Sequence, residues 1–525
     1  MRNRIFHVLP VLLCLVLVLP FKVQAEKGGT QDSFDSIEAI ILILKEKGIL
    51  TDKESTEFIR RYREGALPKG VSTPQKIYIE QVKDEVSEEV KEEVREDVKK
   101  EIVRSLANRA SAYSSNWANR VRWGGDIRIR YQGDLFGEDN VEDLVDPQDP
   151  GNTINTTEDR HRGRIRVRIG ARALINEQVE AGVRLATGNE DNPVSTNDNL
   201  GDYNTRDTVT FDQAYLKWEP WPDNPFTAFK AWAGRIPNPF FSTSLVWDSD
   251  LHFEGAAVNY KTQLTPMWDG FVNAGFFSIQ EVERWQDDKW MYGAQAGLEY
   301  TIEDFVRDID TVSAKLGVAF YDYMEIEGVR EEVLGDPAQN DPSLPPYLQK
   351  GNTLFNTVPS VSGRQPEYGL ASDFDQLSLT GQIDIGIYDP VHIILTADYV
   401  KNIGYDEERI REIDPDWEEE AEGYSLSLSV GNPKVRVPGD WRCSVGFKHL
   451  ERDAVLDAFT DSDFHLGGTN AEGWYLRGEI GLLTNVWLTG RWISADQISD
   501  KYQPWSDSEG PLAVDTFQLD LNAVY

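Results

Sequence analysis

Apolar and polar residues alternate one by one along most of the chain from residue 121 to the C-terminus. In the first such segment, Trp123, Ile127 and Tyr131 share one side, while Arg128 and Arg130 fall on the other. The same period of two returns in residues 160–172, 312–320, 377–385 and 517–525. Successive side chains of a strand point to opposite faces, so this period predicts strands with one apolar and one polar face. Such strands are typical of a sheet with lipid on one side and water on the other.

Sixteen segments of this kind begin near residues 121, 160, 178, 208, 228, 253, 270, 289, 312, 374, 391, 422, 440, 472, 485 and 514. Short connections, near 176–177, 388–390 and 484–485, alternate with long ones, near 137–159, 189–207, 237–252, 324–372, 402–421, 451–471 and 495–512. Outer-membrane barrels have short periplasmic turns and long external loops. We therefore expect an all-β transmembrane, up-and-down antiparallel barrel of about 16 strands over residues 117–525, with both barrel ends facing the periplasm.

A soluble all-β protein, such as a propeller or a sandwich, is the alternative to this fold. Such proteins bury their aromatic residues on a core face. Here the tryptophans fall near strand ends or on the apolar face, as in the aromatic girdles of membrane barrels. They are Trp218, Trp221, Trp268, Trp441, Trp474 and Trp492.

The first 116 residues are unlike the rest and predict helices. Residues 1–25 read as a secretory signal, with Arg2 and Arg4 before an apolar run and a small-residue cleavage site at its end. Residues 26–70 predict a helical hairpin. Residues 71–116 predict a charged helix with an apolar residue in every turn from Val82 to Leu106. This helix is either a solvated single helix or a self-associating coiled-coil stalk, which would be trimeric if the barrel is.

Composition excludes several classes of protein. The net charge of −36 argues against nucleic acid as a partner, because phosphate contacts need a basic face. After removal of the signal, Cys443 is the only cysteine left, so no disulfide can form within the chain. No nucleophile elbow, phosphate loop or zinc-protease motif is present, and we expect neither an enzyme, nor a cofactor, nor a dedicated metal site.

Arginine is concentrated on the polar face of the first three strands. These residues are Arg128, Arg130, Arg162, Arg164, Arg166, Arg168, Arg172 and Arg184. Facing the lumen, they would form a basic patch that draws anionic solutes, since charged rings are a common selectivity device. The alternative is an electrostatic brace, in which the arginines pair with acidic loops.

The third long connection, residues 237–252, is the candidate for a loop that folds inward and narrows the pore. It carries Asp248 and Asp250, with Glu254 just after, and four aromatic or aliphatic residues that can attach it to the wall. We hypothesise that the arginines of residues 162–168 face Asp248 and Asp250 at or near the narrowest point, which would create a transverse field. The acidic loop over residues 402–422 reads as solvated surface; the alternative is divalent cations that bridge it to lipopolysaccharide.

Two segments resemble a known family. Residues 211–218 (Phe-Asp-Gln-Ala-Tyr-Leu-Lys-Trp) and 234–240 (Gly-Arg-Ile-Pro-Asn-Pro-Phe) are similar to segments of the putative porins of bacterial outer membranes, as are the N-terminal helices and the terminal Tyr525. The resemblance implies a porin fold and passive diffusion of small hydrophilic solutes or ions. It leaves open a structural anchor whose helix tethers the membrane to the cell wall. The expected partners are outer-membrane lipid and lipopolysaccharide and copies of the same chain in a trimer. The tether alternative adds peptidoglycan, and the helical segment is expected in the periplasm.

Overall fold

The structure, a computed structural model, describes residues 120–142, 144, 153–283, 287–306, 309–330, 344–358, 367–387, 390–413, 415, 417–500 and 510–525. The signal expected at 1–25, the helical hairpin at 26–70 and the charged helix at 71–116 therefore lie outside the described residues. Among the helices that are described, none has the length and apolar character needed to cross a membrane.

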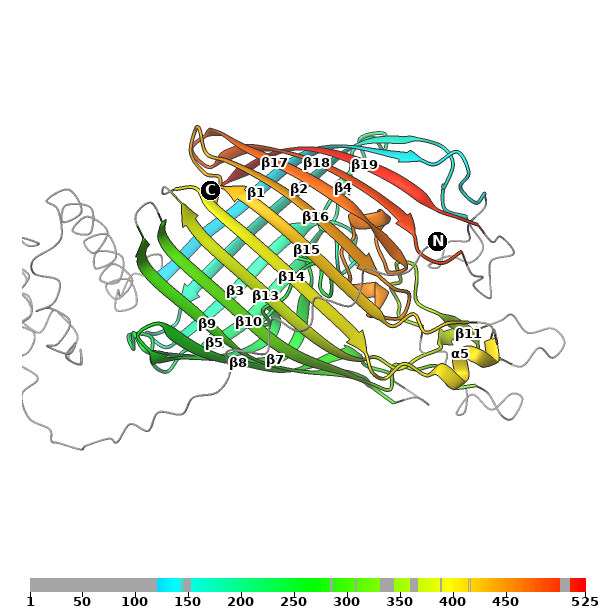
Figure 1. The fold of residues 1–525 in the computed structure, drawn as a ribbon, viewed down its shortest axis with the longest axis horizontal. Helices are drawn as coiled ribbons and strands as arrows, with labels where there is room; N and C mark the ends of the chain where they lie inside the picture. The colour runs from blue at the N-terminus through cyan, green and yellow to red at the C-terminus, as the bar shows by residue number, and fades with distance from the viewer. Residues whose placement is uncertain are drawn as a thin grey trace, which may run out of the picture. The chain divides into compact units, whose positions relative to one another are not determined.

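Sixteen long strands form one closed antiparallel sheet in the described part of the chain (Figure 1). Each pairs with the long strands before and after it in the chain, and β1 pairs with β19 to close the barrel. The strands are β1 (Val121–Phe136), β2 (Arg160–Leu174), β3 (Val179–Thr187), β5 (Val209–Trp218), β6 (Thr227–Pro237), β7 (His252–Thr265), β8 (Trp268–Gln280), β9 (Lys289–Val306), β10 (Ile309–Met324), β13 (Asp375–Ile387), β14 (His392–Asn402), β15 (Glu422–Gly431), β16 (Trp441–Leu450), β17 (Ala471–Leu483), β18 (Val486–Gln497) and β19 (Ala513–Val524).

The expected barrel of about sixteen strands is confirmed. The largest difference in a strand start is at β10, which begins at Ile309 rather than near residue 312. A register irregularity between Ile309 and Thr311 interrupts the alternation there, so the period of two becomes visible only after it. The smaller elements inside the loops were not predicted: β4 (Asp198–Asn199), which pairs with β2, the pair β11 (Leu354–Asn356) and β12 (Tyr368–Leu370), and helix α5 (Glu407–Ile413).

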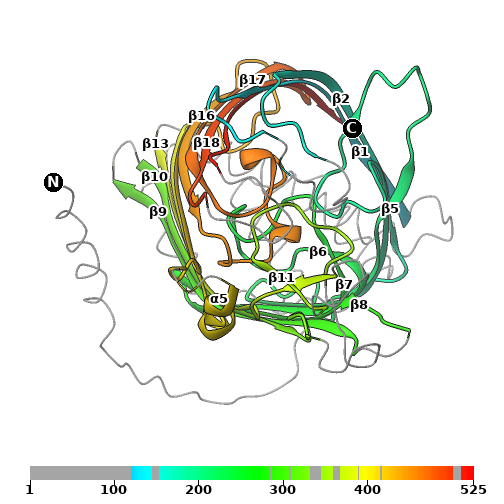
Figure 2. The ribbon, with the colours of Figure 1, turned by 90° about the vertical axis from the view of Figure 1, so that its right-hand side faces the viewer.

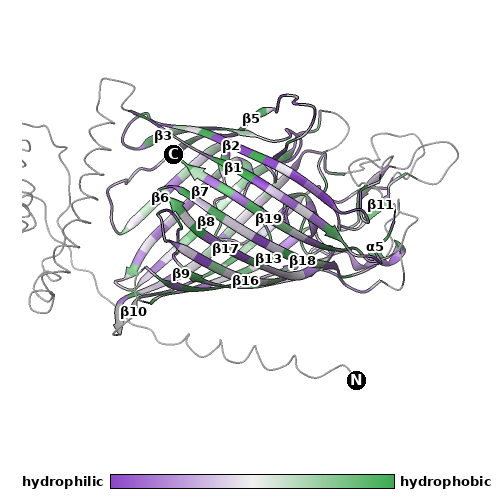
Figure 3. Ribbon diagram, turned by 90° about the horizontal axis from the view of Figure 1, so that it is seen from above, coloured by the Kyte–Doolittle hydropathy of each residue, from purple (hydrophilic) through white to green (hydrophobic). Residues whose placement is uncertain are grey.

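The two faces of the wall differ as the alternation predicts. On β13, Leu377, Leu379 and Ile383 are about two-fifths exposed on the outside, whereas Gln376 and Ser378 are almost fully buried inside. Figure 3 shows the resulting bands of hydrophilic and hydrophobic residues along the strands. An apolar outer face costs little in contact with lipid, and many polar groups of the inner face form hydrogen bonds within the barrel, as Ser378 and Thr380 do with Asp398.

Exposed aromatic residues lie near both ends of the outer wall. Trp268 and Phe276, both on β8, are eight residues apart and exposed. At about 3.4 Å per residue and a strand tilt of about 40°, this separation corresponds to about 20 Å along the barrel axis, close to the height of an apolar membrane band. The girdle at the short-turn end includes Trp123, Trp218, Trp268, Trp441 and Tyr525, and that at the long-loop end includes Phe211, Phe276, Tyr292, Tyr424 and Trp474.

Several long loops fold into the barrel. We number the long loops in chain order: L1 is residues 137–159, L2 is 188–208, L3 is 238–251, L5 is 325–374 and L7 is 451–470. Figure 2 shows the segment that contains the short helices η2 (Asp457–Phe459) and η3 (Phe464–Leu466), in orange, inside the ring of strands. Residues of L2, L3, L5 and L7 share one buried apolar cluster with the inner wall, which includes Val194, Trp247, Leu348, Leu456 and Tyr321. The barrel interior therefore holds a packed core made of loops.

Candidate functional site: an arginine wall and two inward loops

Six arginines stand side by side on the inner face of β1 and β2; we call them the arginine wall. Strand pairing places Arg128 directly opposite Arg166 and Arg130 opposite Arg164. Like charges in directly opposed positions destabilise a sheet unless counter-charges lie nearby. The wall consists of Arg128, Arg130, Arg162, Arg164, Arg166 and Arg168.

Carboxylates on the strands supply part of that counter-charge. Asp126 accepts hydrogen bonds from Arg166 at 2.9 Å and from Arg168 at 2.8 Å. Asp134 lies 2.9 Å from Arg162. Asp520 of β19 accepts two hydrogen bonds from Arg130, at 2.7 and 3.0 Å, which fixes the plane of this buried guanidinium group.

L3 supplies a further carboxylate. Asp250 lies 3.0 Å from Arg168 and 3.7 Å from Arg166, and it accepts a 2.9 Å hydrogen bond from the hydroxyl of Thr196 in L2. Burial by itself would raise the pKa of Asp250, but Arg166 and Arg168 outweigh burial and lower it. The structure thus brings Asp250 and these two arginines into direct contact, rather than facing each other across open space.

Asp248 does not contact the arginine wall. Its carboxylate accepts the backbone N–H of Asp250 at 2.7 Å and that of Ser462, in L7, at 2.9 Å. Burial, with Asp461 and Asp250 nearby, raises the pKa of Asp248 well above its usual range. Asp248 therefore joins L3 to L7, and the hypothesis that it faces the arginines needs correction.

Three other predicted residues lie apart from the wall. Glu254 belongs to β7 rather than to the inward loop, and its exposed carboxylate lies 2.5 Å from Arg235. Arg184 of β3 forms an ion pair with Asp212 and contacts His252. Arg172 is exposed on β2, and no carboxylate of the described residues lies within ion-pair distance of it.

L3 crosses the interior to the opposite side of the barrel. The hydroxyl of Thr243 donates to Asp398 of β14 at 2.7 Å, and Lys448 of β16 donates to the Ser244 carbonyl at 3.0 Å. The backbone N–H of Phe241 donates to Gln295 of β9 at 2.8 Å. Since its other end binds Arg168 through Asp250, L3 is a strap across the lumen, attached at both sides.

L7 brings a second carboxylate to the wall, which the sequence did not single out. Asp463 lies 3.0 Å from Arg130 and 2.9 Å from Arg491 of β18, and it accepts a 3.0 Å hydrogen bond from Gln518. Burial would raise its pKa, but Arg130 and Arg491 dominate and lower it below its usual range. No local signal distinguishes Asp463 from its neighbour Asp461, because the pairing depends on how the loop folds.

L5 holds L7 in this folded form. Gln349 donates to the carbonyls of Asp457 and Thr460 at 2.8 and 2.9 Å, and Asn352 donates to those of Arg452 and Val455, both at 2.8 Å. Lys350 donates to the Gly467 carbonyl at 2.6 Å. Side chains of L5 thus satisfy buried backbone carbonyls of L7, which would be costly to leave unpaired.

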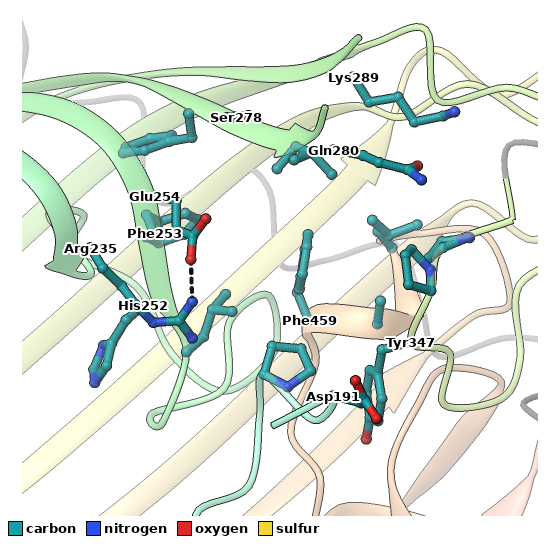
Figure 4. Close-up of a pocket in the computed structure, with 18 of the residues that line it drawn as sticks. Asp191, Arg235, His252, Phe253, Glu254, Ser278, Gln280, Lys289, Tyr347 and Phe459 are labelled. Carbon is teal, nitrogen blue, oxygen red and sulfur yellow. Dashed lines mark hydrogen bonds and ion pairs between the residues drawn. The ribbon is translucent and has the colours of Figure 1, made fainter. Parts of the chain in front are cut away.

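Two cavities lie next to the inward loops. One, of about 460 Å³, is bordered by Arg160 and Arg162 of β2 and by Lys350 and Leu466 of the loops. Figure 4 shows the other, of about 230 Å³, with the Arg235–Glu254 pair on one side and Phe459 and Tyr347 across from it. The first cavity gives access to the arginine wall from the long-loop side.

Comparison with known proteins identifies relatives of the chain. The sequence profile of the family described as "Putative porin" matches residues 36–525. Three solved structures are similar: the outer membrane channel DcaP of Acinetobacter baumannii (13% identity, TM-score 0.39, 77% of this chain and 97% of that chain covered), OprB of Pseudomonas putida (11%, 0.42, 77% and 94%) and OccK11 (OpdR) of Pseudomonas aeruginosa (10%, 0.35, 77% and 95%). None of the curated protein sequences matches the chain.

Proposed function

We propose that this chain, which belongs to the putative porin family of the outer membrane, lets small solutes pass through its barrel and prefers anions. The observation that supports the preference most directly is the arginine wall. Its six guanidinium groups face three carboxylates on the strands, Asp126, Asp134 and Asp520, and two on the loops, Asp250 and Asp463. The wall therefore keeps a positive excess inside a protein whose net charge is −36.

The pairing also defines where the excess lies. Arg164 donates to Gln132 and to the Asn197 carbonyl, both at 3.3 Å, and no carboxylate of the described residues lies within ion-pair distance of it. Arg164 stands between Arg162 and Arg166 on the same face of β2. The positive local field at this position attracts a solute anion and repels cations.

Neutralising Arg164, Arg166 and Arg168 together (each to Gln) tests the preference. In planar bilayers with a salt gradient, the reversal potential of the variant should lie closer to the equilibrium potential of the cation than that of the wild type does. The matched control replaces Arg206, Arg330 and Arg411, which lie in outer loops, by Gln, and it should keep the wild-type potential. An unchanged reversal potential in the wall variant would remove the proposal.

A second role, as a tether, rests on the apolar residues that recur in every turn of the predicted helix from Val82 to Leu106. As a trimeric stalk in the periplasm, this helix would link three barrels to peptidoglycan, and transport would be incidental. Deleting residues 26–112 separates the two roles, provided that the signal is kept. A tether mutant should release outer-membrane blebs while its conductance stays normal, whereas a plain porin should show no envelope defect.

A further inference from the structure

The contacts of Asp463 are those of a bound anion. One oxygen, Oδ1, accepts from Arg130 at 3.0 Å and from Gln518 at 3.0 Å, and the other, Oδ2, accepts from Arg491 at 2.9 Å and from Arg130 at 3.2 Å. Both oxygens are thus bound by two donors. We call Arg130, Arg491 and Gln518 the Asp463 site.

The donors and the acceptor come from different parts of the molecule. Arg130, Arg491 and Gln518 belong to β1, β18 and β19 of the barrel wall, whereas Asp463 belongs to L7. Arg130 is held independently by Asp520, which binds its Nε and Nη2 and leaves Nη1 for Asp463. Arg130 would therefore keep its place if L7 moved away, and the backbones of Arg491 and Gln518 are fixed by the paired strands β18 and β19.

A cavity also lies close to the site. The cavity of about 460 Å³ is bordered by Leu466 of L7, three residues from Asp463, and by Arg162 of the arginine wall. An anion in this cavity lies beside both the loop and the wall. The loop's hold on the wall through Asp463 is a set of charge-assisted hydrogen bonds, which another oxyanion can form equally well.

We propose that the Asp463 site is an oxyanion-binding site whose resident ligand is the protein's own loop carboxylate, and that a solute carboxylate, sulfate or phosphate group binds by displacing Asp463. The proposal rests on the anion path proposed above and adds a step to it. The solute exchanges with Asp463 on Arg130 and Arg491, and L7 detaches from the wall while the solute is bound. Oxyanions displace the loop better than chloride does, since two oxygens can bridge two guanidinium groups.

Hydrogen exchange of the full chain in detergent micelles tests the displacement. Sodium sulfate is compared with sodium chloride at equal ionic strength, and deuterium uptake is followed in peptides from L7. Local opening of a loop increases with a ligand that binds only the open form, by the factor 1 + [L]/Kd. We expect L7 exchange to rise saturably, about tenfold when sulfate is near ten times its Kd, with the strands unchanged.

Variants make the outcome specific. Asp463→Asn should exchange rapidly in L7 in both salts and show no further response to sulfate. Asp496→Asn, which removes one negative charge from the exposed outer side of β18, should respond as wild type does. Equal L7 exchange of the wild type in sulfate and chloride, or an equal sulfate response in Asp463→Asn, would overturn the proposal.

The result separates this proposal from the anion preference. A sulfate response in L7 without an anion-selective reversal potential would leave the Asp463 site standing and remove the preference. A selective reversal potential without a sulfate response would do the reverse.

Discussion

The hydroxyl of Thr243 donates a 2.7 Å hydrogen bond to the carboxylate of Asp398, across 155 positions of sequence. Ser378 and Thr380 donate to the other oxygen of this carboxylate, at 3.4 and 3.2 Å. The inner wall at β13 and β14 therefore presents an acceptor already in place for the loop. Together with the hydrogen bonds of Lys448 and Gln295 to L3, this contact fixes where the loop crosses the lumen.

Replacing Thr243 by Val should loosen L3. The valine keeps the shape of threonine but removes the hydroxyl, so this oxygen of the buried Asp398 carboxylate keeps only the longer 3.3 Å hydrogen bond from the backbone N–H of residue 243. Losing a hydrogen bond to a charged group costs about 1.5–3 kcal/mol. We expect a larger and noisier single-channel conductance than in wild type. Thr262→Val, which removes a hydroxyl paired with Thr227 at the short-turn end, is the matched control and should leave the conductance steady.

The contacts by which L5 holds L7 should weaken as the pH rises through about 6. Asp453, fully buried, accepts from the Thr353 hydroxyl at 2.6 Å and from its N–H at 2.8 Å. Burial raises the pKa of Asp453 from 3.8 to about 6, so the folded state favours the protonated carboxyl group. The resulting stabilisation is present below pH 3.8 and is lost as the pH rises through about 6.

The measurement is hydrogen exchange in L7 at pH 5 and pH 7.5, corrected for the intrinsic rate. Wild type should be better protected at the lower pH, and Asp453→Asn, which cannot ionise, should lose most of this difference. The difference between the two proteins removes the contribution of other groups that titrate in this range. One of them is Lys350, because burial lowers its pKa to about 7. A pH response of the same size in both proteins would contradict the assignment to Asp453.

Replacing Arg130 by Met should destabilise the whole barrel. Arg130 is 2% exposed, and the change leaves Asp520 and Asp463 buried without their main counter-charge. Breaking a buried ion pair from one side costs about 3–5 kcal/mol, whereas an exposed pair contributes below about 1 kcal/mol. In urea titrations followed by gel mobility, Arg130→Met should unfold at a lower urea concentration than wild type. Lys401→Met, at the long-loop end of β14, should unfold at the same urea concentration as wild type. Adding Asp520→Asn to Arg130→Met should restore part of the loss; no recovery would count against the ion-pair explanation.

Replacing Leu379 by Lys tests which face of the wall meets lipid. Leu379 is exposed near the middle of β13, and a lysine at the membrane midplane of a barrel costs about 2–4 kcal/mol. Gln382→Lys places the same charge on the inner face of the same strand and should cost much less. Folding into lipid vesicles, measured by urea titration, should distinguish the two, and equal losses would contradict the assigned faces.

The strands could be predicted because their signal is local. Each strand of the barrel shows its two faces within its own residues, so the period of two marks nearly every start. The arginine wall follows from the same rule, since Arg128 to Arg168 occupy the polar positions of two adjacent strands.

The loop contacts could not be predicted in the same way, because they join distant segments. Asp248 and Asp250 are two residues apart in one acidic loop, yet one binds Arg168 and the other binds a backbone N–H that is 214 positions away. Asp463 differs from Asp461 only in what the folded loop brings near it. The identity of an acidic residue says that it needs a partner, but the fold decides which partner it meets.

The seam between β1 and β19 has a consequence for how the chain matures. The N–H of Gly125 donates to the Tyr525 carbonyl at 3.2 Å, and that of Tyr525 donates to the Gly125 carbonyl at 3.0 Å. The open edge of β1 is therefore covered only after Tyr525, 400 positions after Gly125 in the chain, has been synthesised and exported. Contacts between such distant segments form slowly, and an uncovered strand edge readily pairs with other chains. The unfinished barrel thus exposes the edge of β1 until β19 arrives, and this interval is when the chain is most prone to aggregate.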